Sequence, residues 1–228
     1  MAVTLLITAT GLEAEPLKKA LSWQPLPFPL GDLFTEPQHD LYLAHLGIAK
    51  VNTAAGLALA IHMLKPDSVI QFGIGGAFQE SGLHLGQVAI ATSETHMDTG
   101  VGSEDDWQDM QAIGFPLVGT HYNTLPVGLE LTGVITQLTG AFPCTFGTSE
   151  TVTGSRTRAD TLYRRFGVAV ESMEGAAAAQ TCAALSVPFA ELRGISNSVG
   201  ERDKTRWNIR SAVEEVNSAV LKVVTQDF

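Results

Sequence analysis

The chain has 228 residues, of which 45% are hydrophobic and 17% charged, and its formal net charge is −10. No Lys or Arg occurs between Lys65 and Arg156, although that span holds ten acidic residues. Because nucleic-acid binding relies on cations that neutralise phosphates, the charge distribution argues against a nucleic-acid partner. No apolar run approaches the roughly 20 residues of a membrane span, and the N-terminus lacks a basic leader. Cys144 and Cys182 stand in apolar surroundings, which indicates free thiols in a reducing cytoplasm. We therefore expect one globular domain, residues 1–228, located in the cytoplasm, with no membrane partner.

The predicted elements alternate between strands and helices along the chain. Apolar and β-branched runs predict strands, and segments with helical periodicity or alanine-rich composition predict helices. In chain order we expect strand 3–9, helix 13–21, a proline-rich loop at 25–29, strand 41–45, helix 47–64, strand 68–72 ending in a glycine turn at 73–76, strand 87–92, a long loop at 95–126, helix 128–138, strand 145–152, helix 156–166, strand 168–170, helix 175–184, strand 189–195 and helix 203–224. This alternation predicts an α/β fold, a three-layer αβα sandwich with helices on both faces of the sheet.

The junction at residues 168–180 is the most informative stretch of the chain. A short strand there leads into an alanine-rich helix, and Glu171 and Glu174 lie at the boundary. Helix N-termini favour carboxylates by up to about 1 kcal/mol, so such an acid can be purely structural. In α/β folds, however, ligands bind at the ends of the strands, where this acid would be placed.

Three other strand ends carry groups that could serve chemistry. Glu13 follows the first strand, the Gly73–Gly76 run follows another, and Ser196 and Asn197 follow a third. Each has an ordinary explanation when taken alone: a first-turn helix acid, tight backbone packing, and a turn or cap residue. The six histidines show no metal-ligand spacing, so we expect no metal and no cofactor.

Taken together, four motifs resemble those of the nucleoside phosphorylase and nucleosidase superfamily, in particular the branch that includes the methylthioadenosine/adenosylhomocysteine nucleosidases. The motifs are Lys50-Val-Asn52, Gly73-Ile-Gly-Gly76, Ser172-Met-Glu-Gly175 and Arg193-Gly-Ile-Ser-Asn197. The resemblance implies a mixed, twisted central sheet, a nucleoside substrate and a homo-oligomer, either a dimer or larger.

The resemblance also implies roles for individual residues. Glu174 matches the acid that binds the ribose hydroxyls, and Glu13 matches the acid that orients and deprotonates the attacking water. Asn197 takes the place of the residue that contacts the purine. The remaining expected substrate contacts are Ile74, Gly75, Gly76, Thr151, Val152, Ser172 and Met173.

One departure from the superfamily pattern concerns phosphate. Phosphorylases of this superfamily commonly carry Arg-x-Gly-Thr/Ser at the glycine turn, whereas this chain has Gln71-Phe-Gly73-Ile74. Gln carries no charge and the side chain of Ile donates no hydrogen bond, so the phosphate clamp is missing. We therefore expect water, not phosphate, to be the nucleophile.

A second departure concerns the base, because the methylthioadenosine nucleosidases have Asp where this chain has Asn197. An amide offers both a donor and an acceptor, which suits a 6-oxopurine with a protonated N7. A carboxylate facing a 6-oxo group would leave a buried acceptor unpaired, at a cost of about 1–3 kcal/mol. This preference resembles that of the futalosine hydrolases, which release hypoxanthine from futalosine in menaquinone biosynthesis.

Several alternatives and details stay open at this point. The chain could be a methylthioadenosine/adenosylhomocysteine nucleosidase that tolerates Asn, a purine nucleoside phosphorylase, or a non-catalytic nucleoside-binding homologue. Futalosine carries a carboxylate on its 5′ side, for which nearby cations are candidates, and the purine needs a stacking partner because Thr151 replaces a Phe. The candidate cations are Arg202, Lys204 and Arg206, and the candidate stacking residues are Phe78 and Phe146.

Overall fold

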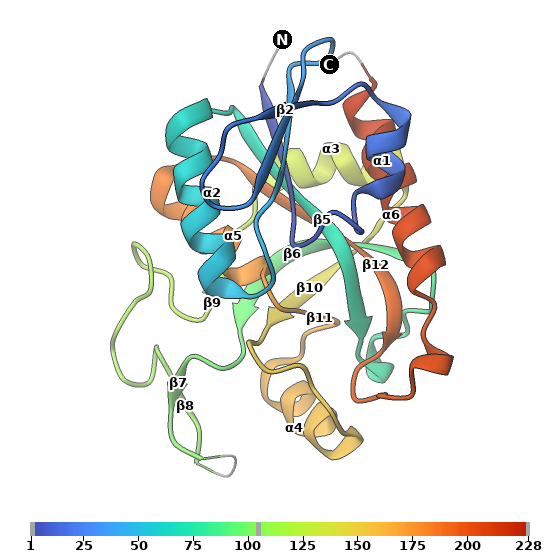
Figure 1. Cartoon of the computed structure of the whole chain (residues 1–228). Helices are drawn as coiled ribbons and strands as arrows, with labels where there is room; N and C mark the ends of the chain where they lie inside the picture. Colours follow the sequence, from blue (N-terminus) through green and yellow to red (C-terminus); the bar gives the residue numbers. More distant parts are fainter. Residues whose placement is uncertain (1–2, 104–105, 227–228) are drawn as a thin grey trace.

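A computed structural model describes residues 3–103 and 106–226 (Figure 1). The two ends of the expected 1–228 domain, together with Glu104 and Asp105, lie outside the described residues. A mixed sheet forms the centre, with the strand order β11-β10-β6-β12-β5-β1-β4-β3-β2, and β9 pairs with β6. Its strands are β1 (Thr4–Thr8), β2 (Gln24–Leu26), β3 (Asp32–Glu36), β4 (Leu41–His45), β5 (Ser68–Ala77), β6 (Val88–His96), β9 (Thr124–Leu125), β10 (Phe142–Thr148), β11 (Val170–Ser172) and β12 (Phe189–Ser198).

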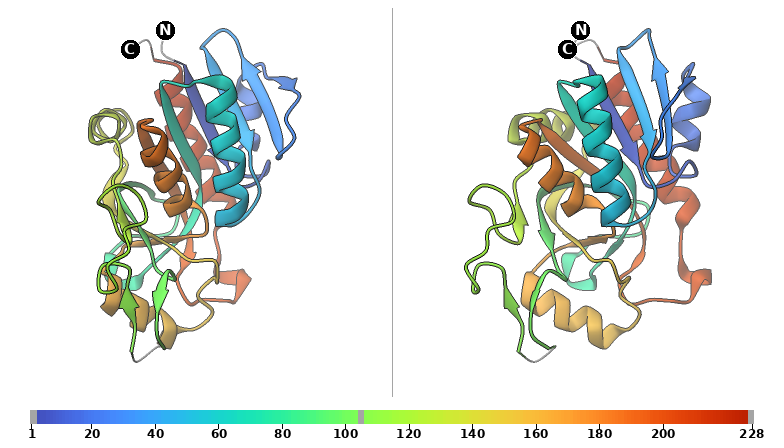
Figure 2. Two further views of the ribbon diagram at one scale, coloured as in Figure 1. Left: turned by 90° about the vertical axis from the view of Figure 1, so that its left-hand side faces the viewer. Right: turned by 60° about the vertical axis from the view of Figure 1, so that its left-hand side comes forward.

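Helices cover both faces of this sheet, as the alternating pattern predicts (Figure 2). One layer contains α2 (Lys50–Leu64) and α5 (Gly175–Leu185), which pack side by side. The opposite layer contains α1 (Glu15–Ala20), α3 (Leu129–Thr139) and α6 (Ile209–Val224). The helix α4 (Arg156–Phe166) lies below the sheet in Figure 1. The expected α/β fold with three layers and a mixed sheet is therefore confirmed.

Two separate apolar cores stabilise the layers. The core under α2 and α5 contains Leu57, Ile61 and Cys182, and the core under α1 and α6 contains Leu17 and Val216. The four alanines in the first half of α5, residues 176–179, are almost fully buried, which lets this helix approach the sheet closely. A third, smaller cluster joins α4 to the lower end of the sheet through Ala159 and Leu162.

The sheet is partly closed at the end where the strands carry their functional groups. Strand β11 pairs in parallel with β10 and also antiparallel with β5, where Glu171 lies opposite Gly76. This second pairing brings the start of α5 against the carboxyl end of β5. A register shift between Ile195 and Asn197 gives β12 a bulge beside the same part of β5.

The prediction of a glycine turn at residues 73–76 is wrong, because β5 continues through these residues to Ala77. None of these glycines is among those with positive φ, so they meet no requirement of a tight turn. They are glycines because neighbouring groups come too close for a side chain: a Cβ at Gly73 would clash with Glu13, and one at Gly75 would lie 2.9 Å from Val170 Cγ1.

Other boundaries also differ from the prediction. The proline-rich loop contains β2 and leads into β3, with which β2 pairs. β2 is the edge strand of the sheet, where proline is tolerated. The strand expected at 145–152 ends at Thr148, so Thr151 and Val152 lie on a loop. Short strands interrupt the 95–126 loop: β7 (Gly100–Val101), β8 (Gln108–Asp109) and β9. The last predicted helix is divided into a 3₁₀ turn at Lys204–Arg206 and α6. Across the described residues, no helix has the length and apolar character that crossing a membrane requires.

Candidate active site

Glu13 lies in the loop that follows β1, and its carboxylate is held from two sides. Oε1 accepts a hydrogen bond from the backbone N–H of Ile74 at 3.1 Å. Oε2 accepts from the backbone N–H of Thr10 at 3.0 Å and from its hydroxyl at 3.2 Å. The side chain is buried, and burial raises its pKa, with a smaller contribution from Glu174 and an opposing one from Arg193. A fixed carboxylate with a raised pKa is suited to general acid–base chemistry.

Glu174 occupies the N-cap position of α5 but does not cap the helix with its side chain. Its Oε1 accepts a hydrogen bond from the backbone N–H of Ala49 at 3.1 Å. Its Oε2 accepts from Nη2 of Arg193 at 3.2 Å. The carboxylate therefore does not serve as the side-chain cap of α5. The carboxylate instead connects the α5 junction to the start of α2 and to β12.

Arg193 joins the two acids, a role that its place in the sequence motif does not indicate. Its guanidinium, which is almost fully buried, donates to Glu191, to the carbonyl of Ile74 and to Glu174. Nη1 also lies 3.9 Å from Oε1 of Glu13. Burial alone would lower the pKa of Arg193, but the surrounding carboxylates outweigh it and raise the pKa, so the residue stays charged.

A signal for this cluster exists in the sequence. Glu191 and Arg193 are two residues apart in a strand, so they share a face, and their neighbours Ala190 and Leu192 are apolar. Charged residues on a buried strand must find partners, which predicts an ion pair there. The distance between Nε of Arg193 and Oε1 of Glu191 is 2.7 Å. The contacts of Arg193 with Glu13 and Glu174 could not be inferred in this way, since they depend on three separate loops and strands.

Asn197 lies at the bulge of β12, opposite Gly76. A Cβ at Gly76 would be 3.2 Å from Nδ2 of Asn197, so this glycine makes room for the amide. Oδ1 accepts from the hydroxyl of Ser196 at 2.8 Å, and Nδ2 donates to the carbonyl of Ser198 at 2.9 Å. Beyond these two bonds the amide keeps one N–H and one lone pair, which matches the donor and acceptor expected toward a purine.

The remaining expected contacts are distributed unevenly. Ile74 and Gly75 belong to the site: Ile74 bonds Glu13 and Arg193 through its backbone, and the carbonyl of Gly75 lies 3.2 Å from the hydroxyl oxygen of Ser196. Met173 is half-buried beside Glu174, whereas the hydroxyl of Ser172 is buried in a network with Thr148 and the N–H of Gly175.

Thr151 and Val152 are exposed, and no bond joins them to the two acids. Their loop contacts elements around the site through Glu150, which accepts from the backbone N–H of Lys50 at 3.0 Å, and through the backbone N–H of Ser149, which donates to the carbonyl of Ser172 at 3.1 Å.

The candidates for stacking and for the 5′ group are occupied elsewhere. Phe146 and Phe78 are fully buried in two different apolar clusters, which is the ordinary packing that the sequence also allowed. Arg202 lies over the ring of Trp207 at 5.3 Å, and Arg206 forms an exposed ion pair with Glu201 at 3.0 Å.

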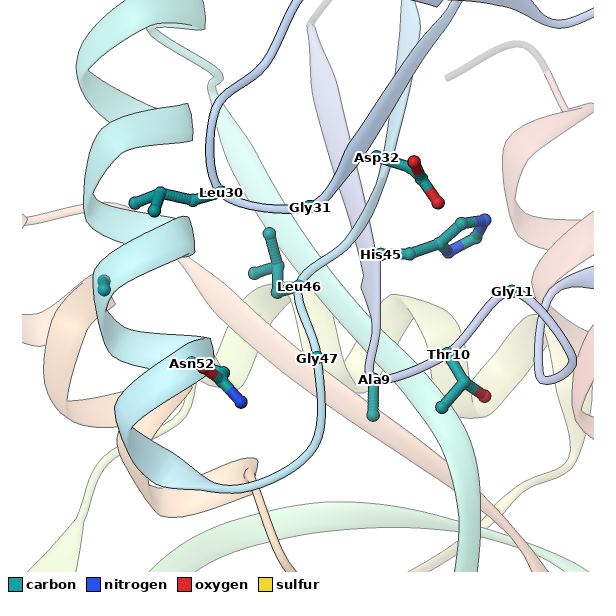
Figure 3. A pocket seen from close by; sticks show the side chains of 11 residues that line it. Ala9, Thr10, Gly11, Leu30, Gly31, Asp32, His45, Leu46, Gly47 and Asn52 are labelled. Atoms are coloured by element: carbon teal, nitrogen blue, oxygen red, sulfur yellow. The ribbon is translucent and has the colours of Figure 1, made fainter.

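A cavity of about 520 Å³ opens between the loop that carries Glu13 and the start of α2 (Figure 3). Its walls come from the ends of β1 and β4, the turn before β3 and the first turn of α2. The lining residues are Ala9, Thr10, Gly11, Leu30, Gly31, Asp32, His45, Leu46, Gly47, Asn52 and Ala55. Thr10, which lines the cavity, bonds Glu13, and Gly47, which also lines it, lies two residues before Ala49, which bonds Glu174. The cavity is thus next to backbone segments that hold the two carboxylates, although neither carboxylate lines it.

His45 faces this cavity as a neutral imidazole. Burial, reinforced by Lys18 and opposed by Asp32, lowers its pKa to about 4. The hydroxyl of Thr8 donates to the carbonyl of Thr10 and lies 2.8 Å from Nδ1, so it accepts from that nitrogen. Nδ1 therefore carries the proton, which leaves Nε2 as an acceptor.

No group of three or more metal-ligating side chains is arranged to hold a metal within residues 3–103 and 106–226. The family model described as the phosphorylase superfamily matches residues 4–226. The chain belongs to the phosphorylase superfamily.

Two relatives within the superfamily illustrate its similarities. A futalosine hydrolase of Streptomyces coelicolor is 37% identical over 188 residues, covering 81% of this chain and 77% of the relative. A 5′-methylthioadenosine/S-adenosylhomocysteine nucleosidase of Exiguobacterium sp. is 32% identical over 187 residues, covering 76% and 74%. Among solved structures, the futalosine hydrolase of Helicobacter pylori superposes with a TM-score of 0.86 at 16% identity, covering 98% of this chain and 97% of that one. At that identity the structural likeness concerns the fold.

Proposed function

We propose that this protein hydrolyses the N-glycosidic bond of a 6-oxopurine nucleoside, with futalosine as the substrate and hypoxanthine as the released base. The observation that carries the proposal is the pairing of Glu13 and Glu174 around Arg193 at the carboxyl ends of the strands. Backbone N–H groups fix both acids, and Thr10, which bonds Glu13, lines the adjacent cavity. The 37% identical futalosine hydrolase supports the choice of substrate.

In the proposed reaction, water is the nucleophile. Glu13 in its ionised form takes a proton from water as the oxygen attacks the anomeric carbon. Glu174 binds the ribose hydroxyls, and its charge stabilises the cation that develops on the sugar while the bond to the purine breaks. N7 of the purine takes a proton from solvent as the bond breaks, and Glu13 later returns its proton to solvent, so the base leaves neutral. Asn197, which has no acidic proton, donates its free N–H to the 6-oxo group and accepts from N7–H of the leaving base.

The charge around the site supports hydrolysis over phosphorolysis. Arg193 is a cation at the glycine-containing end of β5, but Glu13, Glu174 and Glu191 surround it. A phosphate anion would meet this excess of negative charge and would compete with the carboxylates for the guanidinium. Gln71 and Ile74 supply no other cation there.

The rival function is that of a methylthioadenosine/adenosylhomocysteine nucleosidase, which the 32% identical relative favours. The identity of the released base separates the two. The substitution Asn197→Asp tests the reason for the choice: it should lower hydrolysis of 6-oxo relative to 6-amino nucleosides by roughly 5- to 150-fold, the equivalent of about 1–3 kcal/mol. An unchanged ratio of kcat/KM values for inosine and adenosine would remove Asn197 from base selection.

We place the reaction in the cytoplasm, because Cys144 and Cys182 are free and burial raises the pKa of Cys144 to about 12. The proposed substrate, futalosine, places the reaction in the futalosine route to menaquinone. We also propose that residues 1–228 act as one domain in a homo-oligomer, without a metal or cofactor. Exposed apolar side chains near the site, Leu12, Ile48 and Val51, support the association of copies.

A further inference from the structure

Two fully buried glutamates lie behind Arg193, and the proposed reaction uses neither of them. Glu94 is on β6 and Glu191 is on β12, and both side chains are 0% exposed. Oε1 of Glu94 and Oε2 of Glu191 have no conventional hydrogen-bond partner within the described part of the chain. Both oxygens occupy the place that a Cβ on Gly175 would take, so a side chain there would clash with each of them. The two unpartnered oxygens are therefore next to each other.

Two buried carboxylates in contact cannot both be ionised, so the pair must hold a proton. Oε2 of Glu94 accepts a hydrogen bond from the hydroxyl of Thr148 at 3.0 Å. The oxygen of that hydroxyl also accepts from the N–H of Ala176 at 2.8 Å and lies 3.2 Å from the hydroxyl of Ser172. Oε2 of Glu94 therefore has a partner, whereas Oε1 of Glu94 and Oε2 of Glu191 have none, which places the shared proton between these two oxygens, on Oε1 of Glu94. Burial and the charge of Glu191 both raise the pKa of Glu94, in agreement with this assignment.

We propose that Glu94 is a positioning residue: the proton on its Oε1 binds Oε2 of Glu191 and so holds Glu191 in the orientation that aims Arg193 at Glu174 and Glu13. The inference rests on the proposed hydrolysis for its effect on the rate. Two contacts support this role. Nε of Arg193 donates to Oε1 of Glu191 at 2.7 Å, and Nη2 of Arg193 donates to Oε2 of Glu174 at 3.2 Å.

The charges that face Glu94 explain why its proton matters. They are Glu191 and Arg193, both on β12; β10 contributes the hydroxyl of Thr148 and α5 contributes Gly175. With Glu94 neutral, one anion lies against Nε of Arg193. With Glu94 ionised, a second buried anion would repel Glu191 and draw the guanidinium away from the two catalytic acids.

The test uses Glu94→Gln, which keeps the shape and places an amide N–H where the proton is. We expect this variant to keep wild-type kcat and KM at pH 7. Wild-type kcat should fall in the alkaline range as Glu94 ionises, and Glu94→Gln should lack that fall. Glu94→Ala removes the donor and should lower kcat by about tenfold or more with little change in KM. Glu36→Gln, which neutralises a buried glutamate on β3, is the matched control and should leave the alkaline fall in place.

Two measurements need no substrate, so they separate this inference from the proposed function. Because folding raises the pKa of Glu94, its contribution to stability is full below the unfolded pKa and is lost as the pH rises through the folded one. The wild type should therefore lose unfolding free energy relative to Glu94→Gln toward alkaline pH. The infrared spectrum of the wild type minus that of Glu94→Gln, both at pH 7, should show a protonated-carboxyl band that comes from the wild type.

Three results would overturn the proposal. The first is a folded Glu94→Gln variant with tenfold lower kcat at pH 7, which would mean that the ionised form is required. The second is an alkaline fall in kcat that is the same in the wild type and in Glu94→Gln. The third is the absence of the infrared band from the wild type.

Discussion

A glutamate that accepts a proton from water works only in its ionised form, and burial opposes that form at Glu13. Its pKa is raised above the ordinary value of 4.5. The rate should therefore fall as the pH drops through this raised pKa, with the acid limb of kcat/KM centred above pH 4.5. The sign for stability is opposite: a raised pKa gives a contribution present below the unfolded pKa and lost as the pH rises through the folded one.

Replacing Glu13 with Gln tests its role directly. We expect Glu13→Gln to lower kcat by about 10²–10⁴-fold, because the amide cannot take a proton from water. Binding of the nucleoside, measured by calorimetry, should be largely retained, since the amide keeps an acceptor for Ile74. Glu15→Gln, two residues along and exposed in an ion pair with Lys19, serves as the control and should keep wild-type turnover. Near wild-type turnover of Glu13→Gln would exclude Glu13 as the base.

The contacts of Arg193 with Glu13 and Glu174 could not be predicted from single residues. The sequence motifs predicted Glu13, Glu174 and Asn197 as separate groups at strand ends, and the structure places the two acids on one guanidinium. A buried Arg within an apolar strand signals a partner, but the sequence does not say which carboxylates converge on it. That convergence depends on the closure of the sheet by β11, which no local pattern predicts.

At the scale of elements, β5 is built around the need for close approach. Gly73→Ala would drive a Cβ against Oε1 of Glu13 and to within 2.9 Å of Nη1 of Arg193. Displacing these groups by a fraction of an ångström to about 1 Å should lower kcat by about 100-fold, measured by base release. Wild-type kcat in Gly73→Ala would contradict the close packing on which the site depends.

A second glycine provides the matched contrast. Gly133 is exposed within α3, and an added Cβ there meets nothing within 4 Å. Gly133→Ala should stabilise the protein by about 0.5–1 kcal/mol in denaturant unfolding, because alanine loses less backbone entropy in a helix. Its activity should be unchanged.

The elements themselves were predictable where their signals are local. The helix at 156–166 begins at the Ser155 cap and ends at Gly167, and both boundaries follow from the sequence. The edge strand β2 was missed because it is only three residues long and contains Pro25, and β3, with which it pairs, was missed with it. The continuation of β5 through its glycines was missed because Gly signals turns and close packing alike.

At the scale of the molecule, three exposed apolar side chains near the cavity predict association of copies. Val51→Glu on α2, at a position that is 77% exposed, should reduce the mass measured by light scattering toward that of a monomer. Leu129→Glu on α3 is the control, because Leu129 is equally exposed but belongs to the opposite helical layer. A mass unchanged by Val51→Glu would exclude this surface as the contact between copies.

The most direct test of the central claim is the base released from futalosine, inosine, methylthioadenosine and adenosylhomocysteine, each with and without phosphate and resolved by liquid chromatography. We predict that hypoxanthine is released from futalosine at a rate that does not depend on phosphate. Adenine from methylthioadenosine in its place would preserve Glu13 and Glu174 but contradict the assignment of the base to Asn197. A requirement for phosphate would contradict hydrolysis itself.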